Sequence, residues 1–597
     1  MALALKLPHW IKKGKAEFLQ GGEYHNLERR IRKIADPKIG CVFYYAFDSS
    51  TRVGPFIGPD IYMPNCGIRT VGAAVYQAGI KNTRVVFGPW NPNFDASYMK
   101  LNNEVPQIFG VGSMQINEAD AHEKIEQVNA LKESRPLIIG GGPHANYQAW
   151  DFFNRDPIKS IDVAVRGEIN VTLSLLEAIL ESKSEKETIL DGFKRARNSG
   201  ALNKIPGLLY ISDDREVLID TGKATQIADF DELPLEIIGL SLLEPRHNNK
   251  ELSTSPTPLN KLRKQGARII SMITSAGCNF RCPYCPIPEM HQYSERAKSP
   301  DRMVFDIKQI LENVGQVSIF GSDDNSFAFK EGYLVELFTK MSKAKANGKS
   351  FSNVLFYGTE ATEHQADLYR HLFPLMRSGG LRAIWFGIED LTAELVKKGQ
   401  TPEKTIRLFN KMIENGISPM PMMMHFDGQP LKTNSSLEGI LDQVEFLRNH
   451  GAQSIQVTYN TPSIGSKDYF EHFERGKVLE QIGDLKVGWK FFDGNHVIST
   501  IHDDILDRQK HLMACYEKFY NLKNSIIALF DYIKARTSGN RFVKDISDVA
   551  LTLQLYGRKG MRISKKNLKQ WLENLETKIY KFTNQVPESQ IPIMGVS

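Results

Sequence analysis

Continuous apolar segments alternate with helical patterns over the first third of the chain. The apolar segments lie near residues 40–48, 83–88, 107–114, 136–141 and 160–167, and the intervening stretches carry apolar residues at helical spacing. Strands that are apolar throughout are typical of a parallel sheet with helices on both faces. The pattern therefore predicts a doubly wound, Rossmann-like α/β domain over residues 36–221, with a hairpin appended at 205–220.

A second series of strands and helices follows. Its apolar strands are expected at 267–277, 316–322, 353–360, 381–390, 418–428 and 454–462, each later one preceded by an amphipathic helix. Six such units suit a partial (βα)6 barrel over residues 263–497, whose chemistry would sit at the carboxyl ends of the strands.

The remaining segments lack this rhythm. Residues 222–262 are rich in Pro, Ser and Thr and are predicted to be a linker. Residues 1–35 are predicted to be a basic helical lead-in. From residue 498 to 597 the pattern is helical with no further βα rhythm, which predicts a helical C-terminal region.

The composition is that of a globular protein with several cores. The chain has 597 residues, of which 41% are hydrophobic and 24% charged, and it has only six cysteines. A disulfide scaffold is excluded at this size and cysteine density. No run of about 18 apolar residues occurs, and the apolar start is too short for a secretory signal. We therefore expect a cytoplasmic protein with reduced thiols.

Positive charge gathers near the C-terminus. Residues 501–597 carry sixteen Lys and Arg against ten Asp and Glu, and the stretch 557–571 has six basic residues, no acidic one, and ends at Trp571. Together with Trp10, Lys12, Lys13 and Lys15, this stretch could rest on the inner face of an anionic membrane. A solvated helix face is the alternative. No RNA-binding motif is present, so no nucleic-acid partner is expected.

Half of the cysteines lie in one short loop. Residues 276–286 read "AGCNFRCPYCP" and follow the first strand of the second series. A structural zinc would need a fourth ligand, for which His291 is the only nearby candidate. Core cysteines do not fit a loop of Pro, Asn and Arg. Three thiolates can instead hold three irons of a [4Fe–4S] cluster and leave the fourth iron open.

The stretch "CNFRCPYC" resembles the CxxxCxΦC signature of the radical S-adenosylmethionine (SAM) superfamily, with Tyr284 at the aromatic position. The resemblance implies that Cys278, Cys282 and Cys285 bind the cluster as the catalytic and metal-binding residues. It also implies that SAM chelates the open iron through its amino and carboxylate groups and is cleaved to a 5′-deoxyadenosyl radical. An external electron donor, such as flavodoxin or ferredoxin, would supply the electron.

Other strand ends of the barrel carry polar side chains that the same resemblance places against SAM. The second strand ends in "FGSDDNSF", and later strands end in "GTEA" and "FGIED". Each carboxylate could instead cap the following helix. The candidates for binding the SAM amino group or ribose hydroxyls are Ser322, Asp323, Asp324, Glu360 and Glu389.

The first domain resembles that of the cobalamin-binding subgroup. The stretches "GGGPHANY" (140–147), "VRGEINVTLSLLEAI" and "MPNCGIRTVGAAV" carry this resemblance. Glycines let the backbone approach a large planar ligand, and helix N-termini can hold its phosphate. No His follows the first strand, in "FDSSTRVGP", so the usual lower ligand of cobalt is missing. The candidate cobalamin-site residues are Gly140, Gly141, Gly142, Gly167, His144, Glu168 and Arg69.

The resemblance implies a cobalamin-dependent radical SAM enzyme that methylates an unactivated carbon. The stretches "QVTYNTPSIGSKDYF" and "WKFFDGNHVI" resemble members that act on hopanoids and porphyrins, which favours a small-molecule or isoprenoid-type lipid substrate. A non-methylating cyclase or ring-rearranging enzyme is the first alternative. An RNA-modifying radical SAM enzyme and a corrinoid carrier without catalysis are the others.

Overall fold

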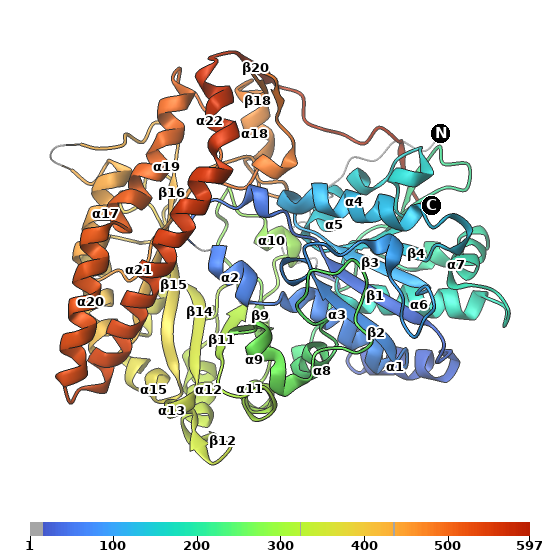
Figure 1. Ribbon diagram of the computed structural model, residues 1–597, viewed down its shortest axis with the longest axis horizontal. Helices are drawn as coiled ribbons and strands as arrows, with labels where there is room; N and C mark the ends of the chain where they lie inside the picture. Colours follow the sequence, from blue (N-terminus) through green and yellow to red (C-terminus); the bar gives the residue numbers. More distant parts are fainter. Residues whose placement is uncertain (1–15, 56, 323, 434–435, 597) are drawn as a thin grey trace.

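The computed structural model describes residues 16–55, 57–322, 324–433 and 436–596. The first α/β unit, the barrel and the C-terminal helices lie side by side along the longest axis (Figure 1). Among the described helices, none is long and apolar enough to cross a membrane.

The first sheet has the doubly wound topology that the apolar pattern predicts. Its parallel strands run in the order β2-β1-β3-β4-β5, and the antiparallel pair β6 and β7 extends it. Cys41 and Phe43 pack into one apolar layer and Val42 and Tyr44 into the other, which is why the strand is apolar throughout. The strands are β1 (Gly40–Tyr45), β2 (Asn82–Phe87), β3 (Ile108–Gly112), β4 (Leu137–Gly141), β5 (Val163–Val165), β6 (Leu208–Ile211) and β7 (Leu218–Asp220).

Helices cover both faces of this sheet. The helices α1 (Glu23–Ile34), α3 (Cys66–Gln77), α4 (Glu118–Asn129), α5 (Pro143–Gln148), α6 (Ile169–Ser182) and α7 (Ile189–Asn198) belong to this unit. Asn65 caps α3 through a hydrogen bond from the Ile68 amide, and Thr188 with Asp191 forms a capping box on α7.

The second sheet is a half-open barrel, as predicted. Its six parallel strands run in the order β17-β16-β15-β14-β11-β8, so β8 and β17 are edges. Ser299 and Thr401 cap the helices α11 and α16 that cover it. The elements are β8 (Ile269–Ile273), β11 (Ser318–Ser322), β14 (Phe356–Thr362), β15 (Leu381–Glu389), β16 (Ser418–His425), β17 (Gln456–Tyr459), α11 (Pro300–Asn313), α12 (Glu331–Lys343), α14 (Glu363–Leu368), α16 (Pro402–Glu414) and α17 (Ile440–Asn449).

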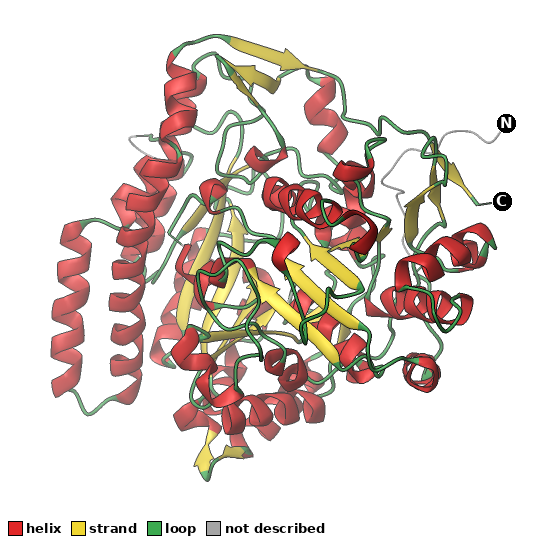
Figure 2. Cartoon of the chain, turned by 45° about the vertical axis from the view of Figure 1, so that its right-hand side comes forward, coloured by secondary structure: helices red, strands yellow, loops and turns green. Residues whose placement is uncertain are grey.

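The C-terminal helices lie against the β17 edge. Tyr459 of β17 donates from its hydroxyl to the Arg508 carbonyl at 2.7 Å, and the Tyr516 hydroxyl donates to the Val457 carbonyl at 2.7 Å. Helices α20 and α21 form a long antiparallel hairpin at the outside of the molecule (Figure 2). The helices are α19 (Ile505–Phe519), α20 (Leu522–Thr537), α21 (Arg541–Asn567) and α22 (Lys569–Glu576).

This C-terminal region also contains strands that the sequence pattern did not indicate. Strand β20 (Tyr580–Thr583) pairs with β18 (Val478–Ile482), and β21 (Ile593–Gly595) joins the first sheet parallel to β7. Strands β20 and β21 are too short to show an alternation of apolar and polar residues, and their partner strands lie far away in the sequence.

The segment 222–262, predicted as a linker, is ordered between the two sheets. It contains α8 (Glu236–Ser241), and Leu243 forms a bridge to Val85 at the edge of β2. Glu236 binds Arg69 of the first unit at 3.3 Å and Lys298 of the barrel at 3.1 Å, all three side chains being buried. This ion network joins the two domains through the connecting segment.

Candidate functional site

The cysteine loop leaves the barrel at the carboxyl end of β8. It lies between β9 (Ser275–Ala276) and α10 (Ile287–Met290). Gly277 has a φ of 91°, and any Cβ there would overlap the Ser294 carbonyl oxygen, so only glycine fits. The Gly277 amide donates to Asp324 Oδ2 at 2.6 Å. The loop is therefore held by the segment that follows β11.

The three thiols are largely removed from water. Cys282 is buried, and Cys278 and Cys285 are half-buried. Asn325 Nδ2 lies 3.8 Å from Cys278 Sγ. Burial raises the pKa of the Cys278 thiol and raises the pKa of Cys285 to about 12, with repulsion from Cys282 as a further cause. A metal that binds these sulfurs must therefore displace their protons.

The donor set fits a cluster better than a single ion. Within the described parts of the chain, no three His, Cys, Asp or Glu side chains converge on a point where one metal ion could be held. Three thiolates that each bind a different iron of a [4Fe–4S] cluster do not need to converge. His291, the candidate zinc ligand, forms an ion pair with Asp324 at 3.1 Å and lies 3.3 Å from Arg296. The zinc hypothesis gains no support from this geometry.

A half-buried cation that the sequence did not single out lies near the loop. Lys398 Nζ binds Glu389 Oε1 at 2.9 Å and lies 5.8 Å from the centre of the Tyr284 ring. Burial alone would lower the pKa of Lys398, but Glu389 and the Cys282 and Cys285 thiolates raise it. Its only sequence signal was a Lys-Lys-Gly turn after the strand that ends at Glu389. The structure thus adds a positive charge beside the three sulfurs.

The remaining strand-end candidates have different surroundings. Ser322 is half-buried at the last position of β11, and Asp323 lies outside the described residues. Asp324 is engaged by Gly277 and His291, so it supports the loop. Glu360 is half-buried on β14 and pairs in register with Trp385 of β15. SAM binding by these residues stays a prediction.

One of the four candidate glycines has open space beside it. Nothing lies within 4 Å of a Cβ built on Gly141, whereas a Cβ on Gly142, whose φ is 87°, would lie 2.8 Å from the Ser113 carbonyl oxygen. A Cβ on Gly140 would overlap the Ile161 side chain. A Cβ on Gly167 would overlap the side chains of Ala224 and Val171. Among these four glycines, the room for a large ligand is therefore at Gly141.

The other three candidates are held by protein partners. His144 is buried, with Nε2 at 3.0 Å from Asp151 Oδ2. Glu168 binds Arg296 at 2.8 Å and accepts from the Ile227 amide at 2.7 Å. Arg69 is 1% exposed and donates to the Ser271 carbonyl as well as to Glu236. Glu168 and Arg69 join the domains, and cobalamin binding by any of the three stays a prediction.

One tyrosine connects the glycine turn to the cysteine loop. Tyr147 of α5, the helix that begins next to Gly142, donates from its hydroxyl to the Pro286 carbonyl at 2.8 Å. A side chain at Gly465, after β17, would collide with the Tyr147 ring. The carboxyl ends of both sheets therefore face each other, which the sequence alone could not establish.

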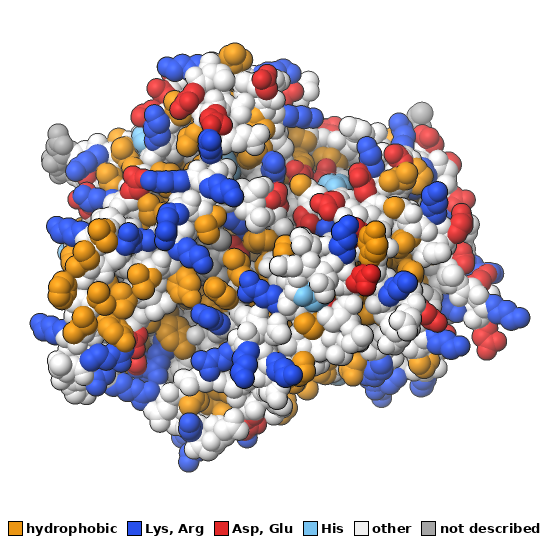
Figure 3. All heavy atoms as spheres, viewed as in Figure 1, with side chains coloured by type: hydrophobic (Ala, Val, Ile, Leu, Met, Phe, Trp, Pro, Cys, Tyr) orange, Lys and Arg blue, Asp and Glu red, His pale blue; other side chains and the backbone are white. Residues whose placement is uncertain are grey.

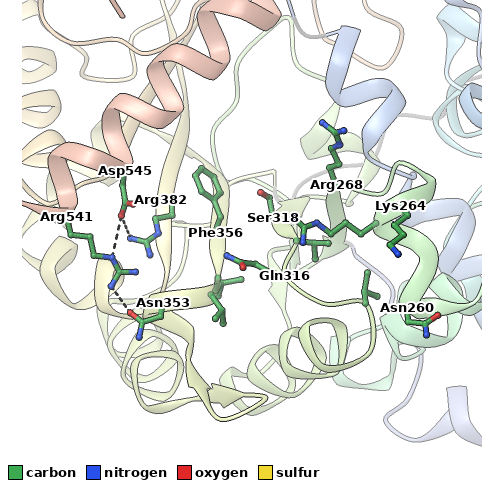
Figure 4. Close-up of a pocket in the computed structure, with 15 residues that line it drawn as sticks. Asn260, Lys264, Arg268, Gln316, Ser318, Asn353, Phe356, Arg382, Arg541 and Asp545 are labelled. Carbon is green, nitrogen blue, oxygen red and sulfur yellow. Dashed lines mark hydrogen bonds and ion pairs between the residues drawn. The ribbon is translucent and has the colours of Figure 1, made fainter. Parts of the chain in front are cut away.

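The described residues also line two cavities at different places in the fold. One of about 1350 Å³ lies between the first unit and the β18 strand, and its wall includes Trp150, Trp489 and Glu118. Burial and the neighbouring Asp151 raise the pKa of Glu118 to about 7. A second, basic pocket of about 890 Å³ lies at the opposite, amino end of the barrel strands, near Ser318 and Phe356 (Figure 4).

Comparison with known proteins agrees with the cysteine motif. The radical SAM superfamily matches residues 272–433. An uncharacterized methyltransferase of Synechocystis is 25% identical over 47% of this chain and 53% of its own length, so the chain spans about half of that relative. The cytidylyl-2-hydroxyethylphosphonate methyltransferase of Streptomyces wedmorensis is 23% identical over 64% of this chain and 70% of its own length.

Solved structures with the same architecture cover most of the chain. The cobalamin-dependent SAM radical enzyme OxsB, with aqua-cobalamin and SAM bound, has a TM-score of 0.55 and 13% identity over 93% of this chain and 79% of its own. The radical SAM methyltransferase TsrM from Kitasatospora setae, with cobalamin and a [4Fe–4S] cluster bound, has a TM-score of 0.52 and 14% identity. The match covers 86% of this chain and 99% of the TsrM chain. Residues 272–433 thus form a radical SAM domain, and the chain as a whole has the fold of the cobalamin-dependent radical SAM enzymes.

Proposed function

We propose that this protein is a cobalamin-dependent radical SAM methyltransferase that methylates an unactivated carbon of a small molecule or isoprenoid-type lipid. The observation that carries the proposal is the approach of the glycine turn at Gly142 to the cysteine loop at Pro286, through Tyr147. A corrinoid at the glycine turn and a cluster at the cysteine loop would face each other across one space. The proposal is supported by the relatives that are named as methyltransferases and by the cofactors bound in the OxsB and TsrM structures.

The residues of the chain supply binding and position. Cys278, Cys282 and Cys285 would each bind one iron, and Lys398 would offset their negative charge. Gly141, beside which the space is open, would let the backbone approach the corrinoid. When bound, the cluster and SAM supply a hydrogen-abstracting radical and cobalamin supplies a methyl group.

Reduction of the cluster requires an electron from outside the chain, for which we propose a flavodoxin or ferredoxin. The substrate would enter the space between the two sheet edges. Glu360 and Glu389, at the ends of β14 and β15, are proposed to contact SAM there.

Anaerobic reconstitution with iron and sulfide tests the central step. We expect the protein to bind about four irons and four sulfides. We also expect Cys278→Ala, Cys282→Ala and Cys285→Ala each to lose the charge-transfer absorption of the cluster. Cys515→Ala, which removes a buried thiol elsewhere, serves as the control and should keep the absorption. A wild-type protein without this absorption would refute the assignment.

The product then separates methylation from the alternative radical reactions. With SAM, reductant, cobalamin and substrate, a methyltransferase yields S-adenosylhomocysteine and a product heavier by one CH2 unit. A product without this mass gain would instead identify a cyclase or ring-rearranging enzyme.

A further inference from the structure

Helix α20 presents its large apolar side chains to solvent. The residues it buries are small or polar, namely Asn524, Ser525, Ala528 and Ala535. The opposite arc is apolar and exposed, with Phe530 at 67% and Leu522 at 58% of their full accessibility. The exposed large apolar residues of this arc, which we call the α20 face, are Leu522, Ile526, Ile527, Leu529, Phe530 and Ile533.

The partner helix leaves the α20 face uncovered. Helix α21 also buries small or polar residues, among them Gly557, Gly560 and Ser564, and it exposes Leu555 and Val543. Gly557 packs against the Tyr520 ring, and Gly560 packs against the Gly54 and Pro55 backbone. The inner faces of the hairpin are thus fully used in packing. An exposed apolar surface of this extent marks an interaction site.

Positive charge surrounds the α20 face. Residues 522–566 contain ten Lys and Arg against three Asp. Lys523 and Lys534 lie on α20 itself, within its exposed surface. Orange apolar side chains over α20 and α21 and blue basic ones around them gather on one face of the molecule (Figure 3).

The basic pocket at the amino end of the barrel adjoins this hairpin. Arg541, the first residue of α21, lines the pocket together with Arg263, Lys264 and Arg268. Lys264 and Arg268 lie across the pocket from Arg541, which is already bonded to Asn353 at 2.6 Å (Figure 4). The exposed cations of residues 263–268 therefore extend the positive surface beyond the hairpin.

We propose that the α20–α21 hairpin docks on the surface of an anionic phospholipid membrane. A helix with one large apolar face and basic neighbours lies in the interface plane, with its apolar side chains among the acyl chains and its Lys and Arg at the headgroups. The Lys and Arg excess around the α20 face complements negative lipids. The proposal does not depend on the reaction catalysed.

The surface differs from the one that the sequence indicated. Trp571, the expected anchor at the end of the basic stretch, is 1% exposed and packs against Phe491 and His496. Trp10 and Lys12 to Lys15 lie outside the described residues. The apolar anchor is therefore assigned to α20 and the charge to the basic residues around it.

Vesicle sedimentation of the full-length protein tests the proposal. We expect binding to vesicles of phosphatidylcholine with phosphatidylglycerol and much weaker binding to phosphatidylcholine alone, with loss of binding at high salt. The double variant Phe530→Ser/Ile533→Ser should bind at least about tenfold more weakly, because it removes two side chains from the inserted face. Lys523→Glu/Lys534→Glu should lose the preference for anionic vesicles.

A matched control distinguishes docking through the α20 face from nonspecific hydrophobic adsorption to vesicles. Leu368→Ser removes an equally exposed apolar side chain (55%) from α14 of the barrel and should bind vesicles like the wild type. Unchanged binding of the Phe530→Ser/Ile533→Ser variant would overturn the proposal, as would failure of the wild type to bind anionic vesicles. If sedimentation velocity instead shows a dimer that this variant dissociates, without vesicle binding, the α20 face is a subunit interface and the proposal is wrong.

Discussion

At the scale of single residues, the charge next to the cysteine loop depends on one ion pair. Lys398 is paired with Glu389 and lies near the Tyr284 ring, which belongs to the loop. Loss of the ammonium would leave the Glu389 carboxylate without its partner in a mostly buried place. It would also remove a positive charge from beside the thiols that are proposed to hold the cluster.

We therefore expect Lys398→Gln to make the cluster harder to reduce. Its midpoint potential should fall by about 50 mV, close to a tenfold change in a one-electron equilibrium. Spectroscopic titration of the reconstituted protein with reductant measures this shift. Lys397→Gln, which changes the exposed neighbouring lysine, is the control and should leave the potential unchanged. Equal potentials in both variants would contradict the role of Lys398.

Two of the residues predicted to bind cobalamin have contacts within the protein that the sequence did not indicate. Arg69 and Glu168 were expected at the corrinoid, yet each forms buried bonds that connect the first unit to the barrel. A sequence shows that such a residue carries charge, but only the tertiary neighbours decide what that charge meets.

At the scale of elements, the last strand of the chain completes the first sheet. β21 pairs with β7, and the Leu218 amide of β7 donates to the Pro592 carbonyl at 2.8 Å. Ile593 is buried, in the same apolar layer as Leu218. About 375 residues of sequence separate Ile593 from its partner Leu218 of β7, so no local pattern could predict the pairing.

Ile593→Ala should lower the free energy of opening this sheet edge by about 2 kcal/mol, because the substitution removes buried methyl groups from a terminal strand. Hydrogen exchange of the Leu218 amide should then become faster. Met594→Ala, at the half-buried neighbouring position, should change the exchange much less. Unaltered exchange in Ile593→Ala would show that β21 does not protect β7.

At the scale of the whole molecule, the relative position of the two sheets decides the chemistry. The Tyr147 hydroxyl reaches the Pro286 carbonyl across the interface, and the ion network of Arg69, Glu236 and Lys298 holds the domains beneath it. Tyr147 touches the cysteine loop and follows the glycine turn, so we expect it to position the two proposed cofactor sites relative to each other.

Tyr147→Phe should leave the cluster intact but weaken the coupling between SAM cleavage and methylation of the substrate. Its Pro286 carbonyl loses a hydrogen bond worth about 1 kcal/mol, so the two edges are held less firmly. We expect more 5′-deoxyadenosine formed per methylated product, with unchanged cluster absorption. Tyr520→Phe removes bonds to the Ile455 backbone far from the loop and is the control for stability. The same product ratio in both variants would exclude a positioning role.

The sequence by itself determined both sheets and the cysteine motif, because strand periodicity and ligand spacing are local properties of the chain. It identified the Rossmann-like unit, the six-stranded barrel and the three thiols. The tertiary structure alone decided which side chains meet, including Lys398 with Glu389, Tyr147 with Pro286, and β21 with β7. It also showed that α20 turns its apolar side outward, because only packing against α21 determines which face of that helix is buried.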